Sequence, residues 1–70
     1  MDPLKVLIID DDRMLCDMVC RQLTYKDHHA EYTVTLKEGM QRLKDRQFDI
    51  VFLDIRLPDG NGLDYLKDIL

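Results

Sequence analysis

The sequence has little of what marks a secreted, membrane-bound or nucleic-acid-binding protein. Its 70 residues include no tryptophan and only two cysteines, Cys16 and Cys20, and no basic segment followed by an apolar run precedes them. Acidic residues outnumber basic ones by 14 to 10, and the net charge of −4 disfavours contact between this segment and nucleic acid or an anionic membrane. We therefore expect a cytoplasmic chain with free thiols.

Several metal and repeat signatures are also absent. Cys16 and Cys20 lie one helical turn apart without a second pair, which is typical of core thiols rather than of a zinc or redox site. No loop of the EF-hand type carries alternating acidic ligands and a closing glutamate, so that calcium site is excluded. No repeat or linker divides the chain, and 46% hydrophobic with 34% charged residues is typical of one globular unit.

Three segments have the pattern of β-strands. Lys5–Ile9 and Ile50–Leu53 are short, mostly unbroken apolar runs, which are typical of strands covered on both faces of a parallel sheet. Residues 31–35 place Tyr32 and Val34 in alternation and predict a second strand, nearer the edge of the sheet than the first.

Helical patterns separate these strands. Asp12 is a natural N-cap, which we favour over a metal ligand, for a helix over Arg13–Tyr25. Residues 35–38, Thr-Leu-Lys-Glu, match a capping box and begin a second helix that reaches about residue 46. A third helix is predicted after the turn that follows the third strand. The apolar positions expected to face the core are Leu15, Met18, Val19 and Leu23 in the first helix, Leu36, Met40 and Leu43 in the second, and Leu63, Leu66, Ile69 and Leu70 in the third.

The alternation of strand and helix predicts an α/β fold with a doubly wound parallel sheet. Right-handed crossovers bring the carboxyl ends of parallel strands to one edge, where ligands bind in sheets of this kind. Asp10 and Asp11 close the first strand and Asp54 closes the third, so we expect the three carboxylates to lie close together.

Such a cluster needs a cation, because two carboxylates about 4 Å apart repel by about 4 kcal/mol at an effective dielectric constant of about 20. The oxygen ligands, with no set of histidines or cysteines nearby, favour Mg²⁺. A carboxylate beside Mg²⁺ can itself attack phosphorus, because the cation offsets the charge that would repel an incoming phosphoryl group. Asp54 is therefore a candidate nucleophile as well as a ligand.

These residues carry a family resemblance. VLIIDDD at residues 6–12, followed by VFLDIRLPDGNG at residues 51–62, resembles the receiver domain of two-component response regulators. The shared pattern is an acidic pair after the first strand, a lone Asp54 after the third, Pro58 four residues later and Gly62 eight residues later. The resemblance implies a flavodoxin-like sheet with strand order 2-1-3-4-5, of which this chain holds the first three strands.

The resemblance also implies residue roles. Asp54 would accept a phosphoryl group from the phosphohistidine of a sensor kinase or phosphotransfer protein. Asp11 and Asp54 would bind Mg²⁺ directly, Asp10 would act through water, and the backbone carbonyl of Arg56 would complete the protein ligands. The chain would be a signalling protein rather than an enzyme. The segment DIRLPDGNGL is similar to receivers of transcriptional activators, which predicts a DNA-binding output module beyond residue 70. Because receivers commonly dimerise through later elements, the resemblance also makes a homodimer possible.

Residues 1–70 would be the N-terminal portion of a single receiver domain. Family members continue with a fourth strand ending in Ser or Thr and a fifth ending in Lys, and neither lies within these residues. We expect the natural chain to continue, because the third strand is apolar enough to be central. Without further strands it would leave an unpaired hydrophobic edge that recruits another chain. Alone, residues 1–70 are predicted to be unfolded, molten or oligomeric.

The same residues bear on three other functional classes. A dinucleotide-binding fingerprint that starts at Gly60 and Gly62 would need glycine where Tyr65 stands. An aspartyl phosphatase would place a second acid where Arg56 stands. The alternative that stays open is a receiver-like module that signals by protein contact without phosphorylation, although the intact acidic pair argues against it.

Overall fold

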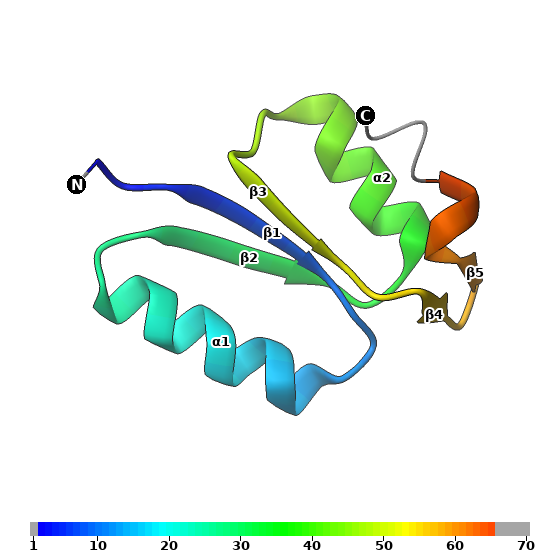
Figure 1. Cartoon of the computed structure of the whole chain (residues 1–70), viewed down its shortest axis with the longest axis horizontal. Helices are drawn as coiled ribbons and strands as arrows, with labels where there is room; N and C mark the ends of the chain where they lie inside the picture. Colours follow the sequence, from blue (N-terminus) through cyan, green and yellow to red (C-terminus); the bar gives the residue numbers. More distant parts are fainter. Residues whose placement is uncertain (1, 66–70) are drawn as a thin grey trace.

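The structure, a computed structural model, describes residues 2–65. Figure 1 shows a small sheet with one long helix on each face. In chain order the elements are β1 (Lys5–Ile9), α1 (Arg13–Tyr25), β2 (His29–Thr33), α2 (Leu36–Asp45), β3 (Ile50–Leu53), the two-residue strands β4 (Arg56–Leu57) and β5 (Gly60–Asn61), and the 3-10 helix η1 (Gly62–Tyr65).

The main sheet is parallel, as the sequence predicts, and has the order β2-β1-β3 that the family resemblance implies. Because side chains alternate along β1, Val6 and Ile8 pack in a cluster with α1, while Leu7 and Ile9 pack with Leu36 of α2 on the other face. These four β1 side chains are buried, whereas Lys5 at the start of β1 is exposed. The central strand therefore fixes both helices, and its carboxyl end has a fixed place between β2 and β3.

Helix α1 has the predicted bounds, and its inner face agrees with the prediction at Val19 and Leu23 but not at two other positions. Asp12 is its N-cap, with the Leu15 N–H donating to Asp12 Oδ1 at 3.1 Å. The predicted core positions Leu15 and Met18 are wrong, since their exposed fractions are 45% and 62%. The helix instead buries Cys16, and beside it the partly buried Val19, Cys20 and Leu23 pack on β1 and β2. These four positions are spaced by three, one and three residues, so they lie on a single face of the helix. Cysteine acts there as a small apolar residue.

Strand β2 begins and ends two residues earlier than the predicted range of 31–35. Asp27, at φ 67°, adopts the left-handed conformation that ends α1, and the chain then enters the sheet at once. His29 pairs with Lys5, and the strand ends at Thr33. The chain must leave the sheet there, because Thr35 is already the N-cap of α2.

Helix α2 follows the predicted capping box. The Glu38 N–H donates to Thr35 Oγ1 at 3.2 Å, and the Thr35 hydroxyl donates to the Glu38 carboxylate at 3.3 Å. Gly39 allows the helix to approach the sheet, because a Cβ there would lie 2.5 Å from Ile9 Cδ1. The glycine in the middle of this helix is thus explained by packing.

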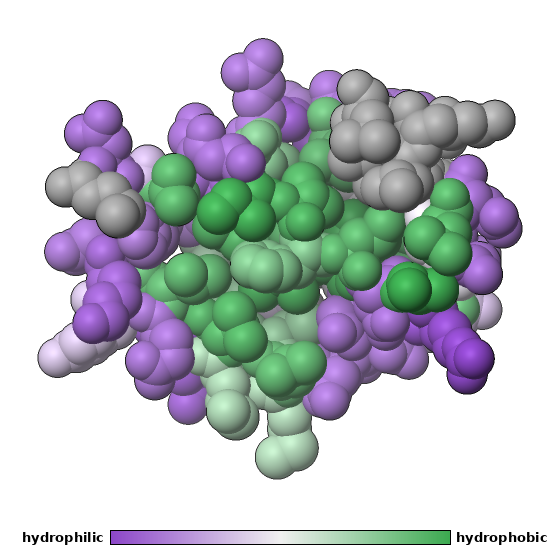
Figure 2. Space-filling view, in the orientation of Figure 1, coloured by the Kyte–Doolittle hydropathy of each residue, from purple (hydrophilic) through white to green (hydrophobic). Residues whose placement is uncertain are grey.

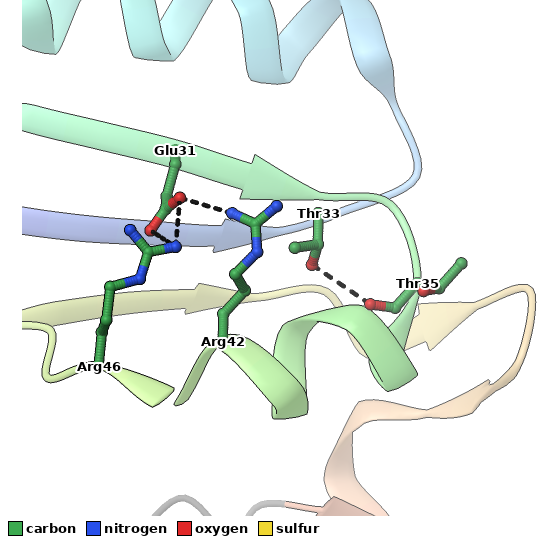
Figure 3. Close-up of polar contacts among 5 residues, drawn as sticks. All are labelled: Glu31, Thr33, Thr35, Arg42 and Arg46. Carbon is green, nitrogen blue, oxygen red and sulfur yellow. Dashed lines mark hydrogen bonds and ion pairs between the residues drawn. The ribbon is translucent and has the colours of Figure 1, made fainter. Parts of the chain in front are cut away.

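An ion-pair cluster joins α2 to the outer strand of the sheet. Figure 3 shows Arg42 and Arg46 reaching from the helix side toward Glu31 on β2, where nitrogen–oxygen distances are 2.5 and 2.9 Å. The Arg46 guanidinium also lies 5.8 Å from the centroid of the Phe48 ring. Because the pairs are partly exposed, we expect them to stabilise the fold only weakly.

The predicted third helix starts as the 3-10 turn η1, and its positions Leu66, Ile69 and Leu70 lie outside the described residues. Figure 2 shows apolar side chains gathered across the middle of one face, between polar side chains at either end. Among the described residues β3 pairs with β1 alone, and its Ile50 and Phe52 are exposed. No helix within residues 2–65 has the length and apolar character needed to cross a bilayer.

Candidate functional site

Three carboxylates meet at the carboxyl end of the sheet. Asp10 and Asp11 follow β1, Asp54 follows the neighbouring strand β3, and one oxygen of each lies within 4.8 Å of the others. Asp10 and Asp54 are half-buried, and Asp11 is exposed. The sequence-predicted residues therefore do come together, for the topological reason given above: β1 and β3 are parallel neighbours and end at the same edge.

Backbone hydrogen bonds hold two of these residues in place. The Asp54 N–H donates to the Ile9 carbonyl at 2.9 Å, and the Asp10 N–H donates to the Thr33 carbonyl at 3.0 Å, so the sheet ladder continues into the site. The Arg56 N–H donates to Asp54 Oδ1 at 3.3 Å. Among the described residues nothing donates to Asp54 Oδ2, which leaves this oxygen open to a ligand.

The donor set fits a hard divalent cation. Three carboxylates supply only oxygen ligands, and a site open on its outer side leaves room for the waters that Mg²⁺ retains. Asp12 is not part of this set, because its side chain caps α1, as expected. The carbonyl oxygen of Arg56, which the resemblance adds as a ligand, is not tested by these contacts and stays a prediction.

A short hairpin follows Asp54 and closes against it. Strands β4 and β5 are antiparallel, with Arg56 opposite Asn61, and the Gly62 N–H donates to the Ile55 carbonyl at 2.6 Å. A Cβ at Gly62 would lie 2.4 Å from the backbone carbonyl oxygen of Asp54. The sequence motif contained this glycine without explaining it, and the structure supplies the reason: the hairpin returns so close to Asp54 that no side chain fits.

The turn between β4 and β5 is hydrogen-bonded to the first turn of α2. The Leu36 and Lys37 N–H groups donate to Asp59 Oδ1 and Oδ2 at 2.8 and 2.9 Å. These bonds from Lys37 and Leu36 lower the pKa of the Asp59 carboxyl below its usual value. Sequence reasoning did not identify Asp59, because an aspartate between proline and glycine is an ordinary turn residue and its partners lie more than twenty positions away.

A buried thiol lies directly behind the acidic site. The Cys16 side chain is fully buried, and its Sγ donates to the Asp10 carbonyl at 3.4 Å. Burial, followed by the negative charge of Asp10, raises the pKa of Cys16 to about 11. The thiol is therefore neutral at physiological pH and acts as core, as its spacing predicts.

We expect Cys16 to resist alkylation in the folded protein until the pH approaches its raised pKa. The folded protein holds the Cys16 proton more tightly than the unfolded chain does. The associated stability is therefore fully present below the unfolded pKa of about 8.5 and is lost as the pH rises through the folded pKa of about 11. Iodoacetamide labelling of native protein, with peptide mapping, should show less reaction at Cys16 than at the partly exposed Cys20. Equal reaction of both thiols at neutral pH would contradict this packing.

Replacing Asp11 should change metal binding and stability in opposite directions. We expect Asp11→Asn to weaken Mg²⁺ binding, because a charged ligand is lost, and to raise the free energy of unfolding without metal by about 0.5–1 kcal/mol through relief of repulsion. Calorimetric Mg²⁺ titration and urea unfolding measure the two effects. Asp12→Asn is the matched control, since asparagine preserves the cap of α1. An unchanged Mg²⁺ titration in the Asp11 variant would remove Asp11 from the site.

One further hollow among the described residues lies away from the carboxylates. It is found near the amino ends of β1 and β2, where Lys5, His29, Arg46 and Phe48 contribute to its walls. The acidic site lies at the opposite, carboxyl end of the strands. The geometry of the carboxylates, not the shape of a cavity, is what identifies it.

Comparison with known proteins agrees with this geometry. A family model described as response regulator receiver domain matches residues 6–70. Among curated proteins, the transcriptional regulatory protein HptR of Staphylococcus aureus is 35% identical over 68 residues, which cover 93% of this chain and 27% of the relative. The chain thus spans about a quarter of the length of the relatives it matches.

Several solved receiver-domain structures are similar in fold. The non-phosphorylated HemR receiver domain from Leptospira biflexa matches with a TM-score of 0.87 at 34% identity, over 97% of this chain and 54% of that one. The beryllofluoride-activated NtrC4 receiver domain dimer matches with a TM-score of 0.84 at 28% identity, over 91% of this chain and 53% of that one. The partial flavodoxin-like fold expected from the sequence is confirmed.

Proposed function

This chain belongs to the response regulator receiver domain family of two-component systems, and we propose that its Asp54 accepts a phosphoryl group from a phosphohistidine. The observation that carries the proposal is the convergence of Asp10, Asp11 and Asp54 within 4.8 Å at the ends of adjacent strands. Three carboxylates at one place repel one another unless a cation offsets their charge.

The proposed step transfers a phosphoryl group between two protein side chains. An Asp54 carboxylate oxygen forms a bond to phosphorus while the phosphorus–nitrogen bond to the donor histidine breaks, and the departing imidazole takes up a proton. The Arg56 N–H holds Asp54 Oδ1, so the open Oδ2 is the oxygen that attacks. Bound Mg²⁺ would offset the charge of the carboxylates and of the phosphoryl oxygens.

Asp11 and Asp54 would hold Mg²⁺ directly and Asp10 through water, with the Arg56 carbonyl as the remaining protein ligand. The exposure of Asp11 supports a direct role for this carboxylate, since it is free to meet the ion. The donor would be a sensor histidine kinase or phosphotransfer protein. The names of relatives support transcriptional control through a segment outside these residues, and the NtrC4 dimer supports a homodimer.

The proposal is tested by incubating the full-length protein with a small phosphodonor and Mg²⁺ and measuring its intact mass. We expect the mass of one added phosphoryl group, its loss in alkali, and no addition when Mg²⁺ is chelated. An unmodified mass under conditions that label a known receiver domain would contradict phosphoacceptance. That outcome would favour the module that signals by protein contact alone.

A further inference from the structure

The contact between Asp59 and α2 joins two segments that the sequence separates widely. Asp59 lies at the tip of the β4–β5 hairpin, and each of its carboxylate oxygens accepts a backbone N–H from the first turn of α2, at 2.8 and 2.9 Å. A carboxylate at a helix N-terminus gains from both the hydrogen bonds and the helix dipole. The tip of the hairpin is therefore held by a rigid element.

The base of the same hairpin carries the site. Arg56 is the first residue of β4, and its N–H is the group that donates to Asp54 Oδ1. At the same base, just after β5, the Gly62 N–H donates to the Ile55 carbonyl, and Gly62 lies against the Asp54 backbone. A displacement of the hairpin would thus move the donor that orients the Asp54 carboxylate.

Helix α2 already has a local cap, so stability of the helix is not the whole reason for the contact. Thr35 accepts the Glu38 N–H and completes a capping box within four residues. Asp59 adds two bonds to other N–H groups of the same turn from more than twenty residues away. Leu57 packs beside this contact in the cluster that contains Leu36, which reinforces the hairpin's place.

We propose that Asp59 is a positioning residue for Asp54. By holding the hairpin tip on α2, it fixes the Arg56 N–H and hence the orientation of the Asp54 carboxylate toward metal and phosphoryl donor. The inference deepens the proposed function and rests on it.

The test compares two ways of weakening the same helix end in the full-length protein. Asp59→Ala removes the tether to the hairpin, whereas Thr35→Ala removes the local cap and leaves the hairpin untouched. We expect Asp59→Ala to weaken Mg²⁺ binding by about tenfold and to slow labelling by a small phosphodonor, as loss of a supporting contact does at metal sites. Thr35→Ala should lower stability but keep the wild-type Mg²⁺ affinity.

Asp59→Asn provides a graded comparison, because asparagine still accepts at a helix N-terminus but without charge. Its Mg²⁺ affinity should lie between those of the wild type and the alanine variant, and it decides the question in the same way if Asp59→Ala does not fold. Equal Mg²⁺ affinities and labelling rates in the Asp59 and Thr35 variants would overturn the inference and reduce Asp59 to a second cap. A wild-type protein that neither binds Mg²⁺ nor labels would instead overturn the proposed function itself.

Discussion

Replacing Asp54 with asparagine is expected to abolish labelling by a phosphorylated kinase while leaving the fold intact. The amide cannot form the acyl phosphate, and it keeps the size of the side chain and an oxygen for the Arg56 N–H. The measurement is transfer of radiolabelled phosphoryl groups from kinase to the full-length variant, with circular dichroism to verify the fold.

Asp12→Asn is the matched control for this experiment. It removes the same charge near the same edge of the sheet, but Asp12 caps α1 and is not one of the three converging carboxylates. We expect this variant to label close to the wild-type rate. Labelling of the Asp54 variant at the wild-type rate would show that another residue is the acceptor.

The substitution Gly62→Ala is expected to damage both stability and labelling. The added methyl group would lie 2.4 Å from the Asp54 carbonyl oxygen and 3.0 Å from Leu53 Cγ, so the backbone of the hairpin or of Asp54 must shift. We expect a loss of about 3 kcal/mol in the free energy of unfolding, typical of forced overpacking. The rate of labelling should fall by more than the loss of folded protein accounts for, because the backbone shift occurs at the acceptor residue.

Gly39→Ala is a useful comparison, because it adds the same methyl group where the nearest atom is the end of the Ile9 side chain. Ile9 can change its rotamer, and alanine also favours the helix by about 1 kcal/mol over glycine. We expect a smaller loss of stability there and near-normal labelling. If both glycine variants behave alike in urea unfolding and in labelling, the close approach of the hairpin to Asp54 has no special role.

Long-range features of the site were predictable where topology alone decides them. Asp10, Asp11 and Asp54 follow two apolar strands, and parallel strands joined by helices must end at one edge, so their meeting follows from the order of elements. The bounds of α1 and β3 were likewise predicted, because caps and apolar runs are local signals. The site roles of these aspartates and of Arg56 stay predictions until metal and phosphoryl transfer are measured.

Features that depend on exact packing were not predictable. Leu15 and Met18 of α1 were misassigned to the core, because leucine and methionine rank high in a hydrophobic pattern. The small Cys16, predicted from its spacing to be a core thiol, is what fits against Val6 and Ile8. The strand β2 was placed two residues late, since the left-handed turn at Asp27 leaves no periodic signal. The contact of Asp59 with α2 could not be found from local sequence, because neither partner shows an unusual residue type.

The most direct test of the central claim is to locate the phosphoryl group. Borohydride reduces an aspartyl phosphate to homoserine, so treatment of the labelled full-length protein followed by peptide mass spectrometry identifies the acceptor. We predict homoserine at position 54 alone, formed only when Mg²⁺ was present during labelling. Reduction at position 10 or 11, or at none of the three carboxylates in a protein that carries label, would contradict the account.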